Sequence, residues 1–413
     1  ADDIRHNASD VSHKLTNMMF NTYWTITDLF GKVDLIIGDD WNYSDSRIHD
    51  YLYHPDTLLL ASQLDMLSAI TDPSNSYDSH HRNWCNTASI IFSQNGTYKL
   101  GLYDIQYDRW RVALNVPVFH QSLDYRRGGI DTLMHGTWVY FRPDASFRHM
   151  SEDGKHDFRL SAGYQCAPVD ILNQIGYRDD SQPLVIKEGN PDLKGTATTS
   201  ADYTRKYGTH VSLWHAGASF NYRHRDVAQS ASYNPVTGVY TYKPMNVSGA
   251  YSATARFDIS ANIGEKRYWT WQMNADANYD HSVDHAMLAG ETESHVNAVN
   301  TTVLHDGTYI QYNKDAFNIR ASGDIRWRHS EGRMHDFETL DALDFNYGLS
   351  ARYTLPRIKT TLSADATMYS RRGYGSSELN TDDFVLNASL SQPFWKGKLI
   401  ARIEAFDLLH QVS

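Results

Sequence analysis

The chain has 413 residues and a formal net charge of −11, and this acidic balance, with no basic block to offset it, argues against nucleic-acid binding. No apolar run approaches the roughly 18 residues that a membrane-spanning helix needs. Two cysteines, Cys85 and Cys166, are too few for a disulfide framework or a zinc site, and only their geometry decides whether they pair. The unusual figure is an aromatic content of 13%, which indicates surfaces rich in amphipathic rings.

Residues 1–85 are assigned to N-terminal strands and loops, and their pattern is the least regular in the chain. Residues 20–43 have the pattern of a hairpin that turns at Gly31 and Lys32. Residues 44–84 mix apolar clusters with polar runs. They include adjacent histidines, His80 and His81, which would point to opposite faces of a strand. We therefore expect incidental histidines and no metal site.

Residues 86–413 form the second segment, in which apolar and polar residues alternate. In residues 251–263 the odd positions are mostly aromatic or aliphatic and the even positions are polar, and the pattern resumes at residues 269–279 after a polar break. A period of two is typical of β-strands, and the short break predicts a hairpin. The same alternation recurs at residues 158–164, 214–222, 317–328, 345–355, 362–368, 384–390 and 399–405.

Strand length and the placement of aromatic rings favour a transmembrane β-barrel over a soluble β-sandwich. Several strands run to 12 or more residues, whereas a sandwich strand usually has about 5–6. Tyr251 and Trp214 open apolar faces, and Trp327 and Tyr353 lie at or near the ends of others. Ten residues at about 3.3 Å each, tilted by about 40°, rise roughly 25 Å, the height of the lipid-facing band of a barrel with two aromatic girdles. We predict an antiparallel transmembrane β-barrel rather than a soluble sandwich.

The polar positions of these strands carry charges that would face the lumen. The predicted lumen-facing residues are Arg256, Asp258, Asp276, Arg320, Asp324 and Arg326. Inward carboxylates can be paired for glycoside hydrolysis. We favour charge ladders that brace the wall and contact a plug, and we predict no catalytic residue, no cofactor and no metal, because the known catalytic and phosphate-binding motifs do not occur.

The predicted connections alternate between short and long. Short ones lie at residues 151–155, 206–208, 264–267, 313–315, 356–357 and 393–398, and long ones at residues 117–135, 168–195, 225–246, 281–299 and 371–383. In outer-membrane barrels the long loops are extracellular. Candidate ligand contacts near that mouth are Arg223, Arg225, Asp280, His281, Arg328, His329, Arg371, Arg372 and Tyr374. Tyrosine rings can stack on flat ligands and arginines can pair with carboxylates; the alternative is solvated loop residues or contacts to lipopolysaccharide.

Several stretches resemble a known family. Residues 189–203, GNPDLKGTATTSADY, look like the Gly-Asn-Pro-x-Leu-Lys start of a barrel strand in TonB-dependent transporters. Residues 114–132, residues 140–147 and the closing residues 379–411 sharpen the likeness. From about Trp84 onward the chain resembles the outer-membrane β-barrel family related to these transporters and common in gut-type Gram-negative bacteria.

The resemblance implies a monomeric barrel of the 22-strand class in the cell outer membrane, plugged by an N-terminal domain and energised by a TonB-type protein. About 15 to 17 strands can be counted and no plug or TonB box is identified, so we expect a fragment of a longer protein. The expected function is uptake of a glycan, peptide or metal chelate, without enzymatic activity. The alternatives are a non-transporting scaffold that binds a surface lipoprotein or other envelope subunits, and a soluble all-β carbohydrate-active protein.

Overall fold

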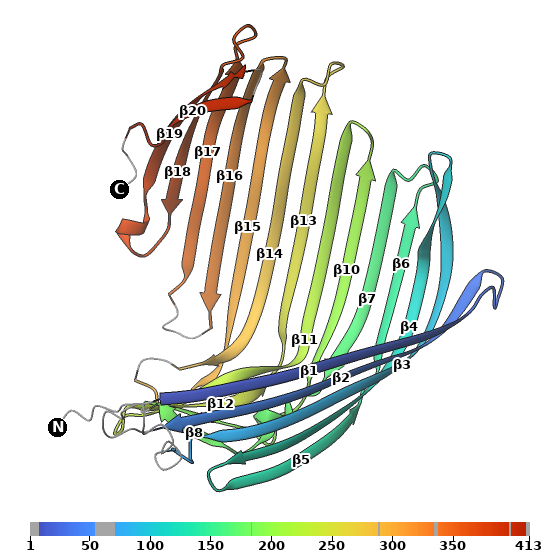
Figure 1. The fold of residues 1–413 in the computed structure, drawn as a ribbon, viewed down its shortest axis with the longest axis vertical. Coiled ribbons are helices and arrows are strands. Elements are labelled where there is room, and N and C mark those ends of the chain that lie inside the picture. Colours follow the sequence, from blue (N-terminus) through green and yellow to red (C-terminus); the bar gives the residue numbers. More distant parts are fainter. Residues whose placement is uncertain are drawn as a thin grey trace.

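The computed structural model describes residues 8–53, 71–182, 184–287, 290–333, 338–395 and 398–409, which form one 20-stranded sheet (Figure 1). The strands are β1 (Ala8–Ile26), β2 (Val33–Tyr53), β3 (Tyr77–Leu100), β4 (Tyr103–Arg127), β5 (Ile130–Val139), β6 (Arg142–Met150), β7 (His156–Ala167), β8 (Arg178–Gln182), β9 (Val185–Glu188), β10 (Thr196–Gly208), β11 (Ser212–Asn234), β12 (Val239–Val247), β13 (Ala250–Ile263), β14 (Trp269–Ala286), β15 (His295–Lys314), β16 (Phe317–Gly332), β17 (Leu340–Thr354), β18 (Thr361–Arg372), β19 (Asp382–Phe394) and β20 (Leu399–Ala405). Two single-turn 3₁₀ helices, η2 (Ile171–Gln174) and η3 (Ser377–Leu379), lie in connections. No helix in the described ranges is long and apolar enough to cross a membrane.

Most strands pair antiparallel with their neighbours in sequence. The ladders join β1 to β4 in order, then β6, β7, β10 and β11, and then β13 to β20. β5 and β6 lie end to end along β4, and β6 also pairs with β7. No ladder among the described residues joins β1 to β20, so the sheet is open there. In Figure 1 the strands β1 to β3 cross the view at a steep angle to β13–β18, because the sheet is strongly curved.

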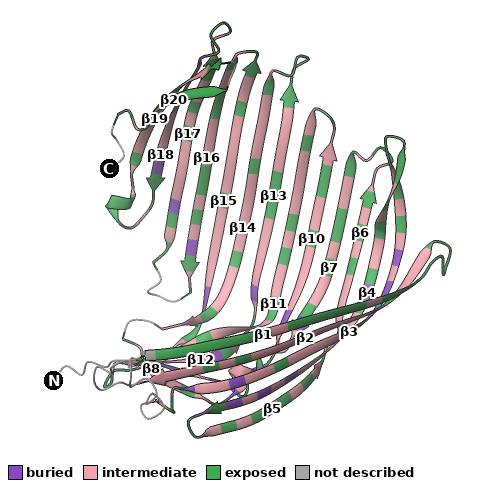
Figure 2. Ribbon diagram, in the orientation of Figure 1, coloured by how far each residue is buried: buried purple, intermediate pink, exposed green. Residues whose placement is uncertain are grey.

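The alternation predicted from the sequence divides the sheet into an apolar face and a polar face. Ala255 pairs with Ala277 on the apolar face, and Arg256 pairs with Asp276 on the polar face. The apolar face is open: Phe220, Leu304 and Leu349 expose 42%, 44% and 52% of their surface. Exposed and half-buried residues alternate along the strands (Figure 2). In the described parts of the chain no second sheet covers this face, which excludes a sandwich.

Aromatic rings form a row at each end of the apolar face. At one end the ring centroids of Trp269 and Tyr312 are 4.8 Å apart. At the other end Tyr251 lies 6.5 Å from Tyr222 and 5.8 Å from Tyr279. Rings of this type prefer the lipid–water interfaces, where the apolar ring body and its polar edge are both satisfied. The two rows therefore mark the limits of a lipid-facing band.

The short connections share one rim of the sheet, along the upper and right-hand side of Figure 1. They join β1–β2, β3–β4, β6–β7, β10–β11, β13–β14, β15–β16, β17–β18 and β19–β20. The hairpin expected at Gly31 is confirmed, and Gly31 has a φ of +62°, which glycine adopts without strain. We call the opposite rim, where most of the longer connections lie, the mouth.

Three of the predicted long connections need correction. The one at residues 117–135 is wrong, because β4 and β5 continue to a tight turn at Gly128, whose φ is +55°. Much of the connections at residues 225–246 and 281–299 is strand, belonging to β11, β12, β14 and β15. These strands extend beyond the lipid-facing band. Both of their faces can meet water there, so alternation no longer marks them.

Candidate functional site

Charged side chains on the polar face form a row across five adjacent strands. In register, Arg256 lies opposite Asp276, Asp276 opposite His305, His305 opposite Arg326, and Arg326 opposite Asp344. Opposite charges placed directly across neighbouring strands attract each other and stabilise the pairing. Arg256, Asp276 and Arg326 were predicted to face the lumen. His305 and Asp344 were not, because only the register between strands places them in this row.

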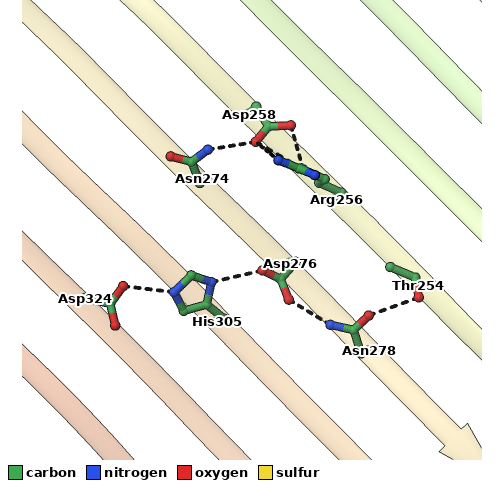
Figure 3. A network of polar contacts seen from close by, with 8 residues as sticks. All are labelled: Thr254, Arg256, Asp258, Asn274, Asp276, Asn278, His305 and Asp324. Atoms are coloured by element: carbon green, nitrogen blue, oxygen red, sulfur yellow. Dashed lines mark hydrogen bonds and ion pairs between the residues drawn. The ribbon is translucent and has the colours of Figure 1, made fainter.

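Hydrogen bonds connect this row to the next one (Figure 3). His305 contacts Asp276 through Nδ1 and Asp324 through Nε2, both at 2.9 Å. Asp258 accepts from Arg256 Nε at 2.9 Å and from Asn274 Nδ2 at 2.9 Å. Each of the three inward carboxylates, Asp258, Asp276 and Asp324, is thus held by a cationic, imidazole or amide partner. That arrangement is the one that a wall-bracing ladder requires.

A polar cavity of about 940 Å³ opens over these rows. Its lining includes five of the six predicted lumen-facing residues, namely Arg256, Asp258, Asp276, Arg320 and Asp324. The guanidinium of Arg320 lies 3.7 Å from the ring centre of Tyr309, which fixes the direction of this long side chain. Within the described ranges no group of three or more His, Cys, Asp or Glu side chains could hold a metal ion. The cavity is suited to hydrated polar groups.

Two of the predicted mouth residues, Arg371 and Tyr374, contact Asp344, and a third, Arg328, is close enough for its charge to act on Tyr374. Arg371 Nε lies 3.7 Å from the Asp344 carboxylate, and the Tyr374 hydroxyl donates to it at 2.8 Å. This hydrogen bond to Asp344 raises the pKa of Tyr374, and the charges of Arg371 and Arg328 oppose the shift. The cluster therefore places two cations and one phenol on the polar face beside the mouth.

The other predicted mouth residues are dispersed. Arg223 pairs with Asp226 at 3.2 Å, and Arg225 donates to the carbonyl of Gly195. Asp280 is exposed on β14, on the polar face. The remaining three belong to the apolar set of positions, next to the aromatic row. His281 stacks on Tyr251 at 4.9 Å, His329 lies 5.7 Å from Trp327, and Arg372 pairs with Asp382 at 2.7 Å.

The connection between β7 and β10 folds back against the polar face of β4. Ile171 and Ile175 pack in a buried cluster with Leu123 and Tyr125. The backbone N–H of Ile171 donates to Gln121 Oε1 at 2.8 Å. We call this connection, residues 168–195, together with β12 the annex. The sequence did not predict it, since η2, β8 and β9 are too short to show a period.

A buried arginine holds the annex to the wall. Arg127 exposes 4% of its side chain, lies 3.1 Å from Asp179, and donates to Asn75 Oδ1 at 2.9 Å. Its guanidinium also lies 5.7 Å from the ring centre of Tyr177. Neither Cys85 nor Cys166 forms a disulfide. The ion pair and the apolar cluster hold the annex, together with the hydrogen bonds of Gln121 and of Asn75.

We predict that acid weakens the docking of the annex. Burial tends to raise the pKa of Asp179, but hydrogen bonds from Ser181 and the charge of Arg127 outweigh it and lower the pKa. The ionised carboxylate is therefore favoured in the docked state. Its contribution is complete above the ordinary aspartate pKa of about 3.9 and is lost as the pH falls through the lower, docked-state value.

Hydrogen exchange of the backbone amides of residues 171–188 measures this effect. After correction for intrinsic exchange, protection should be lower at about pH 2.5 than at about pH 5. Asp179→Asn should reduce the difference, because the pH-dependent charge is gone. Equal protection at both pH values would show that the pair does not hold the annex.

Residues 172–315, from η2 through β15, match the model of the outer membrane protein beta-barrel family. The chain is an outer-membrane β-barrel protein. The matched stretch contains the annex apart from its first four residues, and three of the five residues of the charged row. A location in the outer membrane excludes the alternative of a soluble all-β carbohydrate-active protein.

Two further comparisons add little to this result. A search of curated proteins finds no match. The solved structure of OmpT, an in-vitro folded outer membrane protein of Vibrio cholerae in its trimer form, is 11% identical in sequence. The match covers 91% of this chain and 93% of that one, at a TM-score of 0.25. At that score the likeness supports no argument about fold or function.

Proposed function

We propose that this barrel wall belongs to a TonB-dependent-type receptor and transporter that takes up a nutrient across the outer membrane. The observation that carries the proposal is the polar face, with its cavity of about 940 Å³ lined by Arg256, Arg320 and their carboxylate partners. A polar solute needs a hydrated path through the membrane, and a charged interior wall opposite a lipid-facing one provides it.

The same face suits a plug domain. Arg256 exposes 59% of its side chain although it pairs with Asp258, so its remaining donors are free to contact a second protein surface. A plug and a TonB-type energising protein are therefore partners in this proposal. A surface lipoprotein or another envelope subunit would contact the mouth, where Arg371 and Tyr374 lie.

Uptake by cells that produce the natural protein tests the proposal. Loss of the gene should abolish accumulation of one labelled solute from panels of glycans, peptides and metal chelates. Loss of the TonB-type energising protein should have the same effect. Uptake of every solute at the normal rate in both strains would contradict the proposal.

A pair of variants links this uptake to the polar face. Arg320→Ala removes a cation from the cavity lining and should lower uptake of a polar solute severalfold at unchanged surface abundance. Arg357→Ala, in an exposed short turn between β17 and β18, is the matched control and should leave uptake normal. Equal uptake in the two variants would show that transport does not depend on this cavity.

One observation favours the second candidate, a scaffold that binds a partner in the envelope. Asp306 lies on the apolar face, in register with Ala275 and Ile325, so its half-buried carboxylate lies in the lipid-facing band. A carboxylate in the lipid-facing band is costly and suits a partner that brings a donor to it. Asp306→Leu should release such a partner from the purified complex and leave uptake unchanged.

A further inference from the structure

The annex carries a cavity that the proposed transport path does not use. Beyond Arg225, β11 no longer pairs with β10 and pairs with β12 instead. This part of β11 therefore extends past the wall at the mouth. The cavity has a volume of about 440 Å³. Its lining residues come from the connection before β10, such as Asn173 and Tyr177, and from the paired strands, such as Gln229 on β11 and Tyr242 on β12.

Tyrosine rings lead into this cavity. Tyr233 and Tyr240 are paired across β11 and β12, with ring centroids 4.7 Å apart. The ring of Tyr240 then stacks with that of Tyr242 at 6.4 Å and an interplanar angle of 21°. Tyr242 and Tyr177 both line the cavity. The rings form a track from the outer end of the annex to the mouth.

The cavity is fixed before any ligand arrives. Tyr177 is held by Arg127 and by the ring of Tyr125, whose centroid is 6.4 Å away. Asn190 donates to the carbonyl of Pro244 at 2.8 Å, which ties β12 to the connection before β10. Binding to such a rigid site avoids the entropy cost of ordering loops.

Two amide side chains in the lining are free to bind a ligand. Neither Asn173 nor Gln229 makes a side-chain hydrogen bond to another described residue, and each offers a donor and an acceptor. Lys187 supplies a cation, while Glu188 is already paired with Arg178 at 3.2 Å. The cavity thus combines ring faces with free amide groups.

We infer that this annex cavity is a binding subsite for an oligosaccharide. The apolar C–H face of a sugar ring can lie on Tyr177 or Tyr242, and its hydroxyl groups can exchange hydrogen bonds with the two amides. An extended peptide is disfavoured beside Tyr242, because β12 is already paired on both edges, with β9 and with β11. This inference rests on the proposed uptake function and names its substrate class.

Calorimetric titration of the purified full-length protein with hexasaccharides tests the inference. The panel contains neutral and uronate-bearing oligosaccharides, with tripeptides as a competing class. At least one oligosaccharide should bind, and Tyr242→Ala and Gln229→Ala should each weaken it by about tenfold or more. Lys187→Ala should weaken only a uronate-bearing ligand. Tyr103→Ala, at a residue 74% exposed near the short-turn rim, is the control and should leave the affinity unchanged.

The outcomes separate this inference from the proposed function. Binding of tripeptides alone, or oligosaccharide binding that Tyr242→Ala and Gln229→Ala leave intact, would overturn the subsite. If no oligosaccharide binds while energised uptake of another solute persists, the subsite is also overturned but the transporter stands. If oligosaccharides bind at the annex and no solute is taken up, the subsite stands and the transport function fails.

Discussion

Replacing Ala255 with arginine is expected to destabilise the protein by about 2–4 kcal/mol, the cost of a cation on the lipid-facing side of a barrel near the bilayer midplane. Ala255 lies between Ala218 and Ala277 in the register, with an aromatic row on either side along the strands. No hydrated surface is within reach of a side chain that points from this position into lipid.

The neighbouring substitution Thr254→Arg provides the matched control. Thr254 lines the polar cavity and donates to Asn278 at 3.0 Å, so an arginine there enters water and loses one hydrogen bond. We expect a cost of about 1 kcal/mol. Urea unfolding of both variants in lipid bilayers measures the difference. Similar unfolding free energies for the two variants would contradict the assignment of one face to lipid and the other to water.

Replacing Arg127 with methionine is expected to destabilise the docked annex by about 3 kcal/mol. Removal of one partner from a buried ion pair leaves the other charge uncompensated, which costs more than the pair itself contributes. Here Asp179 would keep its charge beside Tyr177 without the guanidinium. We expect faster trypsin cleavage after Lys187 and lower hydrogen-exchange protection of η2.

Arg126→Met is the control for this prediction. Arg126 exposes 64% of its side chain and lies 3.6 Å from Asp124 and 3.7 Å from Asp131, so its loss should cost less than about 1 kcal/mol. The double variant Arg127→Met/Asp179→Leu should recover much of the protection, because it leaves no unpaired charge. If both single variants are cleaved at the same rate, Arg127 does not hold the annex.

The sequence predicted the wall well because lipid and water impose a period of two. Ala255 and Arg256 are neighbours in the chain, yet one meets acyl chains and the other meets the lumen, so their chemistry has to differ. The same reasoning placed Tyr251 and Trp214 near the ends of the apolar face. These are local constraints, and a single strand is enough to show them.

The annex could not be predicted in this way. β12 and the outer part of β11 stand beyond the lipid-facing band, so no apolar set of positions is required, and residues 225–246 had the pattern of a loop. The turn at Gly128 was missed for a related reason, since polar residues in the outer parts of β4 and β5 conceal the strands that flank it.

The charged row was predicted in part. Asp276 and Asp324 were assigned to the lumen, but their common partner His305 depends on the register of β14 with β15 and of β15 with β16. β15 itself gave little signal, because its apolar face includes Asp306 and Thr308. Pairing between strands is a property of the whole sheet, and one strand's sequence does not specify it.

The central claim, that lipid lies on one side of each strand and water on the other, is tested most directly by spin labels placed one at a time at residues 251–259. In bilayers, the labels at odd positions should collide with molecular oxygen, which concentrates in lipid. Labels at even positions should collide with a water-soluble nickel complex. The collision rates with oxygen and with the nickel complex should therefore both alternate with a period of two, and the maxima of one should fall at the minima of the other. Equal accessibility at neighbouring positions, such as Ala255 and Arg256, would contradict the central claim.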